Sequence, residues 1–264
     1  YFLAQKVGHD PLCNLSLLKI SEKPKDFTFI SFSGVKEDSS VGAILIGVTC
    51  ALDFKIAPTY GIMQSHEFSF GKRLFPTKMI RSSMPLGLGE IGAPVFDLNG
   101  RFVGITYAAL PDLRSSFLLP ARACMRIRDD LLLSGKIDYG WFGVTTNRKI
   151  NLENSFDLVI DDFVPDSPAS FSKLKKGDIL KRIAGTSITS PGDLAHASFF
   201  AKPGTFVEFV VEREGNELII PVKVGSKPTG NASEASLNGQ TPYDGNLSSD
   251  YPSLPGDLNI SVNP

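Results

Sequence analysis

One stretch, residues 87 to 105, constrains the fold more than any other part of the chain. Two apolar runs, Pro94–Asp97 and Arg101–Ile105, are separated by an Asn-Gly pair. Asn-Gly between apolar runs is a strong hairpin signal, because both residues tolerate positive φ angles. Three glycines crowd just before the first run, where glycine lets the backbone come close to itself or to a ligand. They are Gly87, Gly89 and Gly92. The stretch predicts a glycine-rich loop followed by a β-hairpin.

Composition limits the function classes. At 264 residues, the chain is long enough for one large domain or two ordinary ones. A net charge of −1 gives no electrostatic case for a nucleic-acid partner. No apolar run approaches the roughly 18 residues of a membrane span. Cys13, Cys50 and Cys124 form neither a zinc pattern nor an evident disulfide framework. We expect no metal site, no cofactor, no nucleic acid and no membrane span in this chain.

The first half of the chain reads as a series of strands followed by one helix. Apolar runs of strand length alternate with Gly or Pro. The expected strands are Leu15–Ile20 (after a turn at Gly8–Pro11), Phe27–Phe32, Ala43–Thr49, Thr59–Gln64, Phe75–Arg81 and Phe117–Pro120. A helix is expected over Ala121–Leu133, because Ala123, Ile127 and Leu131 recur at a spacing of four. Gly135 follows as its C-cap.

The glycine-rich loop resembles the nucleophile loop of trypsin-like serine proteases of the HtrA/Deg family. There, Gly-Asn-Ser-Gly-Gly-Pro precedes a similar hairpin. Aligning Pro94 with the family proline places Glu90 on the asparagine and Ile91 on the nucleophilic serine. Isoleucine has no hydroxyl, so it cannot form an acyl-enzyme. The resemblance implies a loop that is kept while its chemistry is lost.

The other two positions of the catalytic triad also fail. The strand Leu15–Ile20 resembles the family's Asp-Leu-Ala-Leu-Leu-Lys-Ile, but Asn14 stands on the aspartate. An asparagine cannot stabilise an imidazolium as a carboxylate does. The family's histidine belongs to an earlier segment that this chain lacks, and none of the three histidines matches it. They are His9, His66 and His196. We therefore expect no catalytic residue, and neither Ser82, Ser83 nor Glu90 has a partner with motif context.

Residues 135 to 225 resemble the PDZ domain that follows the protease in HtrA proteins. The expected elements are the strands Leu158–Phe163, Ile179–Ile183, Val207–Arg213 and Glu217–Val224, a short helix after the turn Val164–Ala169, and a helix over Pro191–Lys202. The matching motifs are Trp141–Val144, Ser167–Ala169, Gly177–Leu180 and Ile183–Gly185. In combination they cover nearly the whole domain.

The PDZ resemblance implies a peptide-binding groove. In such a domain a partner's C-terminus adds a strand to the sheet, and its carboxylate enters a nest of backbone N–H groups. Trp141, Phe142, Gly143 and Val144 fall on the carboxylate-binding loop. Asp193, Ala197 and Phe200, at i, i+4 and i+7, fall on the helix face toward the peptide. The alternative is a closed groove in which Trp141 and Phe142 are only core anchors, or one covered by the insert Asn147–Ser155.

The expected fold class is mainly β: a partial trypsin-like double β-barrel, mostly the second barrel, followed by an α+β PDZ domain. The expected domains are residues 1–134 (degenerate protease), 135–225 (PDZ) and 226–264, a Gly-, Pro-, Asn- and Ser-rich tail predicted to be disordered. A half barrel would expose strand edges, so a fragment of a longer protein is expected.

The resemblance implies a non-catalytic pseudoprotease that binds peptide or protein C-termini, in scaffolding or in regulation of active HtrA-like relatives. A homo-oligomer and an extracytoplasmic location, periplasmic or secreted, are further expectations from the family alone. Two alternatives stay open. The chain is either a truncated view of an HtrA-like serine endopeptidase or a purely structural subunit of an oligomer.

Overall fold

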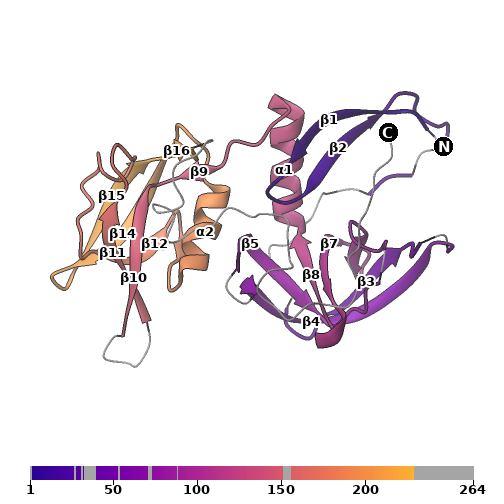
Figure 1. Ribbon diagram of the computed structural model, residues 1–264, viewed down its shortest axis with the longest axis horizontal. Coiled ribbons are helices and arrows are strands. Elements are labelled where there is room, and N and C mark those ends of the chain that lie inside the picture. Colours follow the sequence, from indigo (N-terminus) through magenta and orange to yellow (C-terminus); the bar gives the residue numbers. More distant parts are fainter. Residues whose placement is uncertain are drawn as a thin grey trace.

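The structure is a computed structural model, and it describes residues 2–26, 28–30, 32, 40–52, 54–70, 73–87, 89–150 and 156–228. Two β-rich units lie side by side (Figure 1). The N-terminal unit contains a hairpin and a barrel, and helix α1 (Ala121–Ser134) packs against both, on the side that faces the C-terminal unit. Most of the predicted tail, from residue 229 on, lies outside the described residues.

The N-terminal hairpin consists of β1 (Ala4–Asp10) and β2 (Leu15–Ile20). The strand predicted at Leu15–Ile20 is confirmed, but the predicted turn at Gly8–Pro11 is wrong. The turn lies three residues later, because the buried Asp10 carboxylate accepts hydrogen bonds from the N–H groups of Leu12 (3.2 Å) and Cys13 (3.0 Å). An aspartate that bonds to the backbone two or three residues ahead starts a turn after itself.

Six strands close into a barrel in the order β3-β4-β5-β8-β7-β6. They are β3 (Ile44–Thr49), β4 (Ala57–Phe70), β5 (Arg73–Ser82), β6 (Pro94–Asp97), β7 (Phe102–Leu110) and β8 (Ser115–Pro120), with a 3₁₀ turn at Pro111–Leu113 before β8. Every second side chain points inward. Leu45, Met63 and Leu118 are fully buried in the barrel interior for this reason.

One predicted barrel strand is absent. Of the run Phe27–Phe32, residues 28–30 and 32 are described, and none of them is in a strand. The side chain of Phe29 is 72% exposed. The six other strands already close the barrel, so no edge is left for this apolar run to pair with.

The predicted hairpin across Asn99-Gly100 is confirmed, with a different turn. Gly100 N–H bonds to Asp97 O at 3.0 Å, and within the turn Gly100 alone has a positive φ, 71°. The Asp97 carboxylate accepts the N–H groups of Asn99 and Arg101, each at 2.9 Å. These bonds and the Arg101 guanidinium hold the pKa of Asp97 below its usual range, although burial opposes that shift.

The predicted helix after β8 is confirmed as α1. It begins after Pro120 and ends at Gly135, whose φ of 71° lets its N–H return to Leu131 O at 2.9 Å. The buried side chains of Ala123, Ile127 and Leu131 form one apolar face that joins the hydrophobic cluster under the hairpin and barrel. Helix α1 thereby holds β1 against the barrel.

The C-terminal unit is a sheet in the order β10-β11-β12-β14-β15, with β13 beside β12. The strands are β10 (Val144–Ile150), β11 (Phe156–Phe163), β12 (Ile179–Ile183), β13 (Thr186–Ser187), β14 (Phe206–Arg213) and β15 (Asn216–Lys223); β9 (Gly140–Trp141) pairs separately with β16 (Gly225–Ser226). The two end strands differ. Pro221 in β15 has no N–H, and proline is tolerated in a strand where its nitrogen faces away from the neighbour.

The short helix predicted after the turn Val164–Ala169 is absent. The segment forms successive turns instead. Ser170 Oγ donates to Ser167 O at 2.7 Å, and Ser172 Oγ donates to Ala169 O at 2.6 Å. Serine hydroxyls that bond to nearby backbone groups compete with helix formation.

Helix α2 (Pro191–Phe200) lies between the sheet and the barrel (Figure 1). Ser190 and Asp193 form a capping box at its start. Ala197 packs into the core beneath the sheet, while Gly192 and His196 contact the barrel strands β4 and β5. This ten-residue helix therefore contacts both units.

Candidate functional site

The loop between β9 and β10 has its carbonyl groups fixed on one side. Phe142 O accepts the N–H of Ala169 at 3.0 Å, and Gly143 O accepts the N–H of Val164 at 2.8 Å. The Oγ of Ser167 also donates to Gly143 O, at 3.1 Å. In a trans peptide the C=O and the following N–H point in opposite directions. The N–H groups of the two residues after these carbonyls therefore point away from the 164–169 turn, as successive donors in an anion-binding nest do.

Glycine is required at position 143. Its φ is 75°, a left-handed conformation that other residues adopt only with strain. A Cβ at this position would also overlap the side chain of Ser167, which is itself fully buried. The loop keeps its shape only because residue 143 has no side chain.

The other residues predicted on this loop have different environments. Trp141 in β9 is half-buried, and its ring borders Gly143. Phe142 is 2% exposed and packs edge-to-face on Phe209, with ring centroids 5.0 Å apart. Val144 begins β10 and is half-buried against the same core. Phe142 thus anchors the loop to the core, while Trp141 and Val144 remain partly accessible.

Strand β10 is an end strand of the sheet. It pairs with β11 along its whole length, from Val144↔Phe163 to Ile150↔Phe156, and its other edge has no strand partner among the described residues. An unpaired edge presents a row of N–H and C=O groups to an incoming chain. The nest and the open edge are continuous, since β10 begins at the last residue of the loop.

Of the three helix residues predicted to face a peptide, Asp193 and Phe200 line one cavity of about 200 Å³ toward the barrel, whereas Ala197 does not. The Asp193 carboxylate caps the helix: its Oδ2 accepts the N–H and hydroxyl groups of Thr189 and Ser190, at 2.8 to 3.0 Å. Ala197 is 4% exposed in the core. Phe200 packs against barrel-side groups, with the Arg122 guanidinium 4.4 Å from its ring centroid. Their peptide-binding role stays a prediction.

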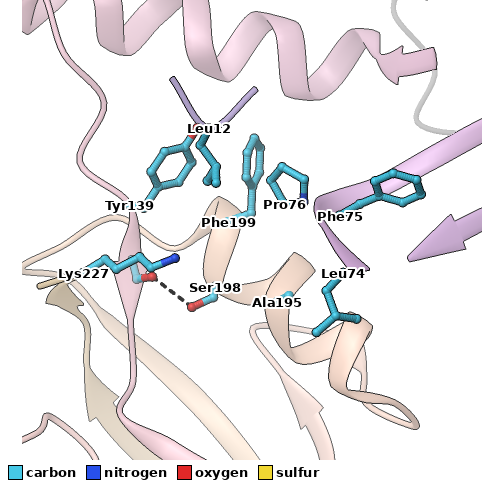
Figure 2. Close-up of a pocket in the computed structure, with 10 residues that line it drawn as sticks. Leu12, Leu74, Phe75, Pro76, Tyr139, Ala195, Ser198, Phe199 and Lys227 are labelled. Atoms are coloured by element: carbon cyan, nitrogen blue, oxygen red, sulfur yellow. Dashed lines mark hydrogen bonds between the residues drawn. The ribbon is translucent and has the colours of Figure 1, made fainter. Parts of the chain in front are cut away.

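Two other α2 residues lie toward β9. Ser198 Oγ donates to Gly140 O at 2.9 Å, and Ala195 lies one turn earlier on the same side of the helix (Figure 2). The sequence did not single out this face, because α2 is almost entirely small or apolar and offers no unique stripe. Only the contact with β9 identifies it.

A cavity of about 50 Å³ lies beside this face, where the C-terminal unit meets the N-terminal unit. Tyr139, Ser198 and Phe199 line one side, and Leu12 and Pro76 line the other (Figure 2). The Lys227 side chain extends toward the cavity, and burial lowers the pKa of its amine. Burial at this junction thus disfavours the charged form of the amine.

The loop that resembles a nucleophile loop is well held. Thr106 Oγ donates to Glu90 O at 2.6 Å and accepts the Ala93 N–H at 2.8 Å. The Glu90 carboxylate accepts the N–H of Gly87, within its own loop. Ile91, at the serine position, is 48% exposed at the surface. The loop presents an apolar side chain where the family has a hydroxyl.

The remaining candidates for hydrolysis are placed as follows. Asn14 is exposed at the end of the β1–β2 turn, with a φ of 51°. Ser82 is fully buried and bonds to Ser116 Oγ at 2.7 Å, and Ser83 Oγ accepts the Ile62 N–H at 3.0 Å. Both serine hydroxyls therefore serve the barrel's own hydrogen bonding.

Two histidines contact hydroxyl groups away from that loop. His9 Nδ1 lies 3.0 Å from Ser16 Oγ and 3.1 Å from Leu15 O, across the β1–β2 hairpin. His196 Nδ1 lies 2.7 Å from Thr77 Oγ, which is 1% exposed. His66 lines a cavity of about 200 Å³ between the barrel and α2. None of these contacts involves residues 87–93.

Metal and membrane signals are also absent from the part of the chain that the structure describes. Its His, Cys, Asp and Glu side chains form no group of three that could hold a metal ion. No described helix has the length and apolar character to cross a membrane.

Comparison with known proteins finds relatives of both parts of the chain. The family model described as "PDZ domain" matches residues 140–224. A "Probable periplasmic serine endoprotease DegP-like" of Pseudomonas fulva is 27% identical over 243 residues, covering 88% of this chain and 50% of the relative. The protein of the same name from Marinomonas sp. is 28% identical, covering 86% of this chain and 50% of the relative. The chain spans about half the length of the curated relatives it matches.

Solved structures show the same fold. "HtrA-type protease AlgW with decapeptide" superimposes with a TM-score of 0.64 at 21% identity, over 87% of this chain and 73% of that one. The "serine endoprotease from Yersinia pestis" gives 0.57 at 18% identity, over 85% and 76%. The fold class predicted from the sequence, a trypsin-like barrel followed by a PDZ domain, is confirmed, as is the HtrA/Deg resemblance.

Proposed function

Because this chain is an HtrA/Deg-type protein with a PDZ domain, we propose that it binds peptide or protein C-termini and does not hydrolyse them. The bound segment pairs antiparallel with the free edge of β10, and its carboxylate accepts the N–H groups of Gly143 and Val144. Such binding draws its affinity from main-chain hydrogen bonds and its specificity from alternate side chains.

One observation carries the proposal: the carbonyls of Phe142 and Gly143 are both bonded to the 164–169 turn. Their orientation leaves two adjacent N–H groups to face a ligand, next to the free edge of β10. A carboxylate that accepts charge-assisted hydrogen bonds from such a nest is held more strongly than a neutral carbonyl would be.

The non-catalytic part of the proposal rests on the residues of the nucleophile-like loop. Acyl transfer needs a nucleophile activated by a nearby base. Ile91 supplies no nucleophilic atom, and Asn14 supplies no carboxylate to orient a histidine. We propose that the barrel acts as a scaffold for the PDZ domain, in regulation of active relatives or in a homo-oligomer.

The location is part of the same proposal. The DegP-like relatives are named periplasmic enzymes. We propose an extracytoplasmic location for this protein. Fractionation of cells that express the full-length protein, with antibody detection, tests it; recovery in the cytoplasm alone would refute it.

The binding experiment uses Trp141, the single tryptophan of the chain. Short peptides ending in an apolar residue are titrated while its fluorescence is followed, and each peptide is compared with its C-terminal amide. A saturable change for the acids and a much weaker one for the amides is expected, since the amide carries no charge for the nest to bind. Equal responses, or none in a folded protein, would refute the proposal.

The second candidate is an HtrA-like serine endopeptidase, favoured by the names of the relatives. The two candidates are separated by a serine-directed fluorophosphonate probe followed by mass spectrometry. The proposal predicts no labelled serine in the folded chain. Specific labelling of Ser82, Ser83 or Ser16, lost on unfolding, would establish the enzyme instead.

A further inference from the structure

Strand β10 carries a positive charge where an incoming peptide would lie. Arg148 and Lys149 are adjacent and exposed near its far end. In the described part of the chain Arg148 forms no ion pair, and its guanidinium lies 5.9 Å from the centroid of the Phe156 ring. This contact is with a half-exposed aromatic ring, so the charge remains available to a partner.

The strand register shows which of the two side chains faces the groove. Arg148 lies opposite Leu158 and Thr146 lies opposite Ile160, and both β11 residues are at most 1% exposed in the core. Directly opposite residues in an antiparallel pair project to the same face of a sheet. Arg148 therefore lies on the face that covers the core and α2.

Lys149 lies on the other face. It is opposite Asp157, whose carboxylate is 3.4 Å from Lys181 Nζ. The two neighbouring cations thus have the same charge and nearly the same position along the strand, but project to opposite faces. Lys149 is a matched control for Arg148.

Antiparallel pairing also fixes which peptide residue meets Arg148. If the last peptide residue lies opposite Val144, each earlier residue lies opposite the next residue of β10. Arg148 is four residues after Val144, so it faces the residue four before the C-terminal one, called position −4 here. Cβ atoms of opposite residues are about 4.5–5.5 Å apart, well within reach of an Arg–carboxylate pair.

Resting on the proposed groove, we infer that the protein prefers partners with Glu or Asp at position −4, and that Arg148 is the residue that selects them. The partner is a protein C-terminus that ends in a carboxylate and carries a second negative charge at position −4. Complementary charge at this position gives specificity more than raw affinity.

The test compares two peptides that differ only in Glu or Lys at position −4, titrated against the whole chain by Trp141 fluorescence and by calorimetry. The Glu peptide should bind about two- to fivefold more tightly at low salt, the range that exposed ion pairs support, and the difference should shrink in high salt. In the Arg148→Glu variant the preference should reverse. In the Lys149→Glu variant the Glu peptide should still bind more tightly than the Lys peptide.

The outcomes distinguish the selection by Arg148 from the proposed peptide-binding groove itself. If both peptides bind equally, with a dependence on the free carboxylate, the groove is real and the selection by Arg148 is refuted. If neither binds a folded protein, the proposed function itself fails. If Lys149→Glu reverses the preference as well as Arg148→Glu does, only the general charge of the strand matters, and the assignment to Arg148 is overturned.

Discussion

His196 Nδ1 of helix α2 lies 2.7 Å from Thr77 Oγ of barrel strand β5 and 3.2 Å from the N–H of Lys78. An N–H can only donate, so Nδ1 is the acceptor and this imidazole is protonated on Nε2 when neutral. A histidine of the PDZ domain therefore satisfies buried donors of the barrel, and one side chain links the two units.

Replacing His196 by Ala should destabilise the protein. The hydroxyl of Thr77, 1% exposed, and the N–H of Lys78 would lose their acceptor, a cost of about 1–3 kcal/mol for a buried unsatisfied group. Urea unfolding measures this change in the free energy of unfolding. Thr77→Val is the matched change, since it keeps the shape and leaves Nδ1 bonded to Lys78, so its effect should be smaller. Equal stability of His196→Ala and wild type would contradict this account.

Gly192→Ala should separate the two units. A Cβ on Gly192 would overlap the Cβ of Phe68 in β4. We expect the linker around residues 136–139 to become more sensitive to limited proteolysis, while each unit keeps its circular dichroism. Combining it with Phe68→Gly should restore protection, because it removes the overlapping atom. Unchanged cleavage of the single variant would show that the interface does not close this linker.

Gly143→Ala should weaken binding of C-terminal peptides at least tenfold, because the left-handed φ and the overlap with Ser167 both displace the N–H groups of the loop. Gly177→Ala is the matched control. Its φ is also positive, 89°, but a Cβ there would meet no atom within 4 Å. It should cost about 1 kcal/mol of stability and leave affinity unchanged. Equal losses of affinity in both variants would mean that backbone strain in general, and not displacement of the loop, causes the effect.

The three thiols should react very differently. Cys50 is exposed, whereas Cys13 and Cys124 are buried, and burial raises the pKa of both buried thiols, that of Cys124 to about 12. Since the thiolate is the reactive form, iodoacetamide at pH 8 should alkylate Cys50 alone in the folded protein. Mass spectrometry reads the site. Rapid alkylation of Cys124 would contradict the described packing.

The same thiol predicts a pH dependence of stability. The folded pKa of Cys124, about 12, lies above the ordinary value of 9.0. Its contribution to stability is fully present below pH 9 and is lost as the pH rises from 9 toward 12, where only the unfolded chain ionises. Unfolding midpoints measured across this pH range should fall less steeply for Cys124→Ala than for wild type. Parallel curves would show that ionisation of this thiol does not cause the loss of stability.

The sequence predicted the elements whose pattern is local. The apolar run Ala43–Thr49 revealed β3, and the spacing of Ala123, Ile127 and Leu131 revealed α1 with its Gly135 cap. The turn after β1 was misplaced, because the deciding bonds come from the buried Asp10 carboxylate. Apolar content at residues 27–32 did not predict pairing, since a strand needs a free edge that the closed barrel lacks.

For a similar reason, the sequence predicted only part of the candidate site. The loop from Trp141 to Val144 follows from a motif in which Gly143 has one workable conformation. The orientation of α2 does not, because the helix consists almost entirely of small or apolar residues, and a periodic pattern then distinguishes no single buried face. Which side meets the barrel is decided by Phe68 and Thr77, more than a hundred residues away in the sequence.

The two ends of the PDZ sheet have different consequences for assembly. At β15, Pro221 removes a donor from the outer edge, whereas β10 keeps an N–H at every position from Val144 to Ile150. The outer edge of β15 therefore lacks one of its donors, whereas the outer edge of β10 lacks none. An incoming strand is expected to pair with β10 in preference to β15.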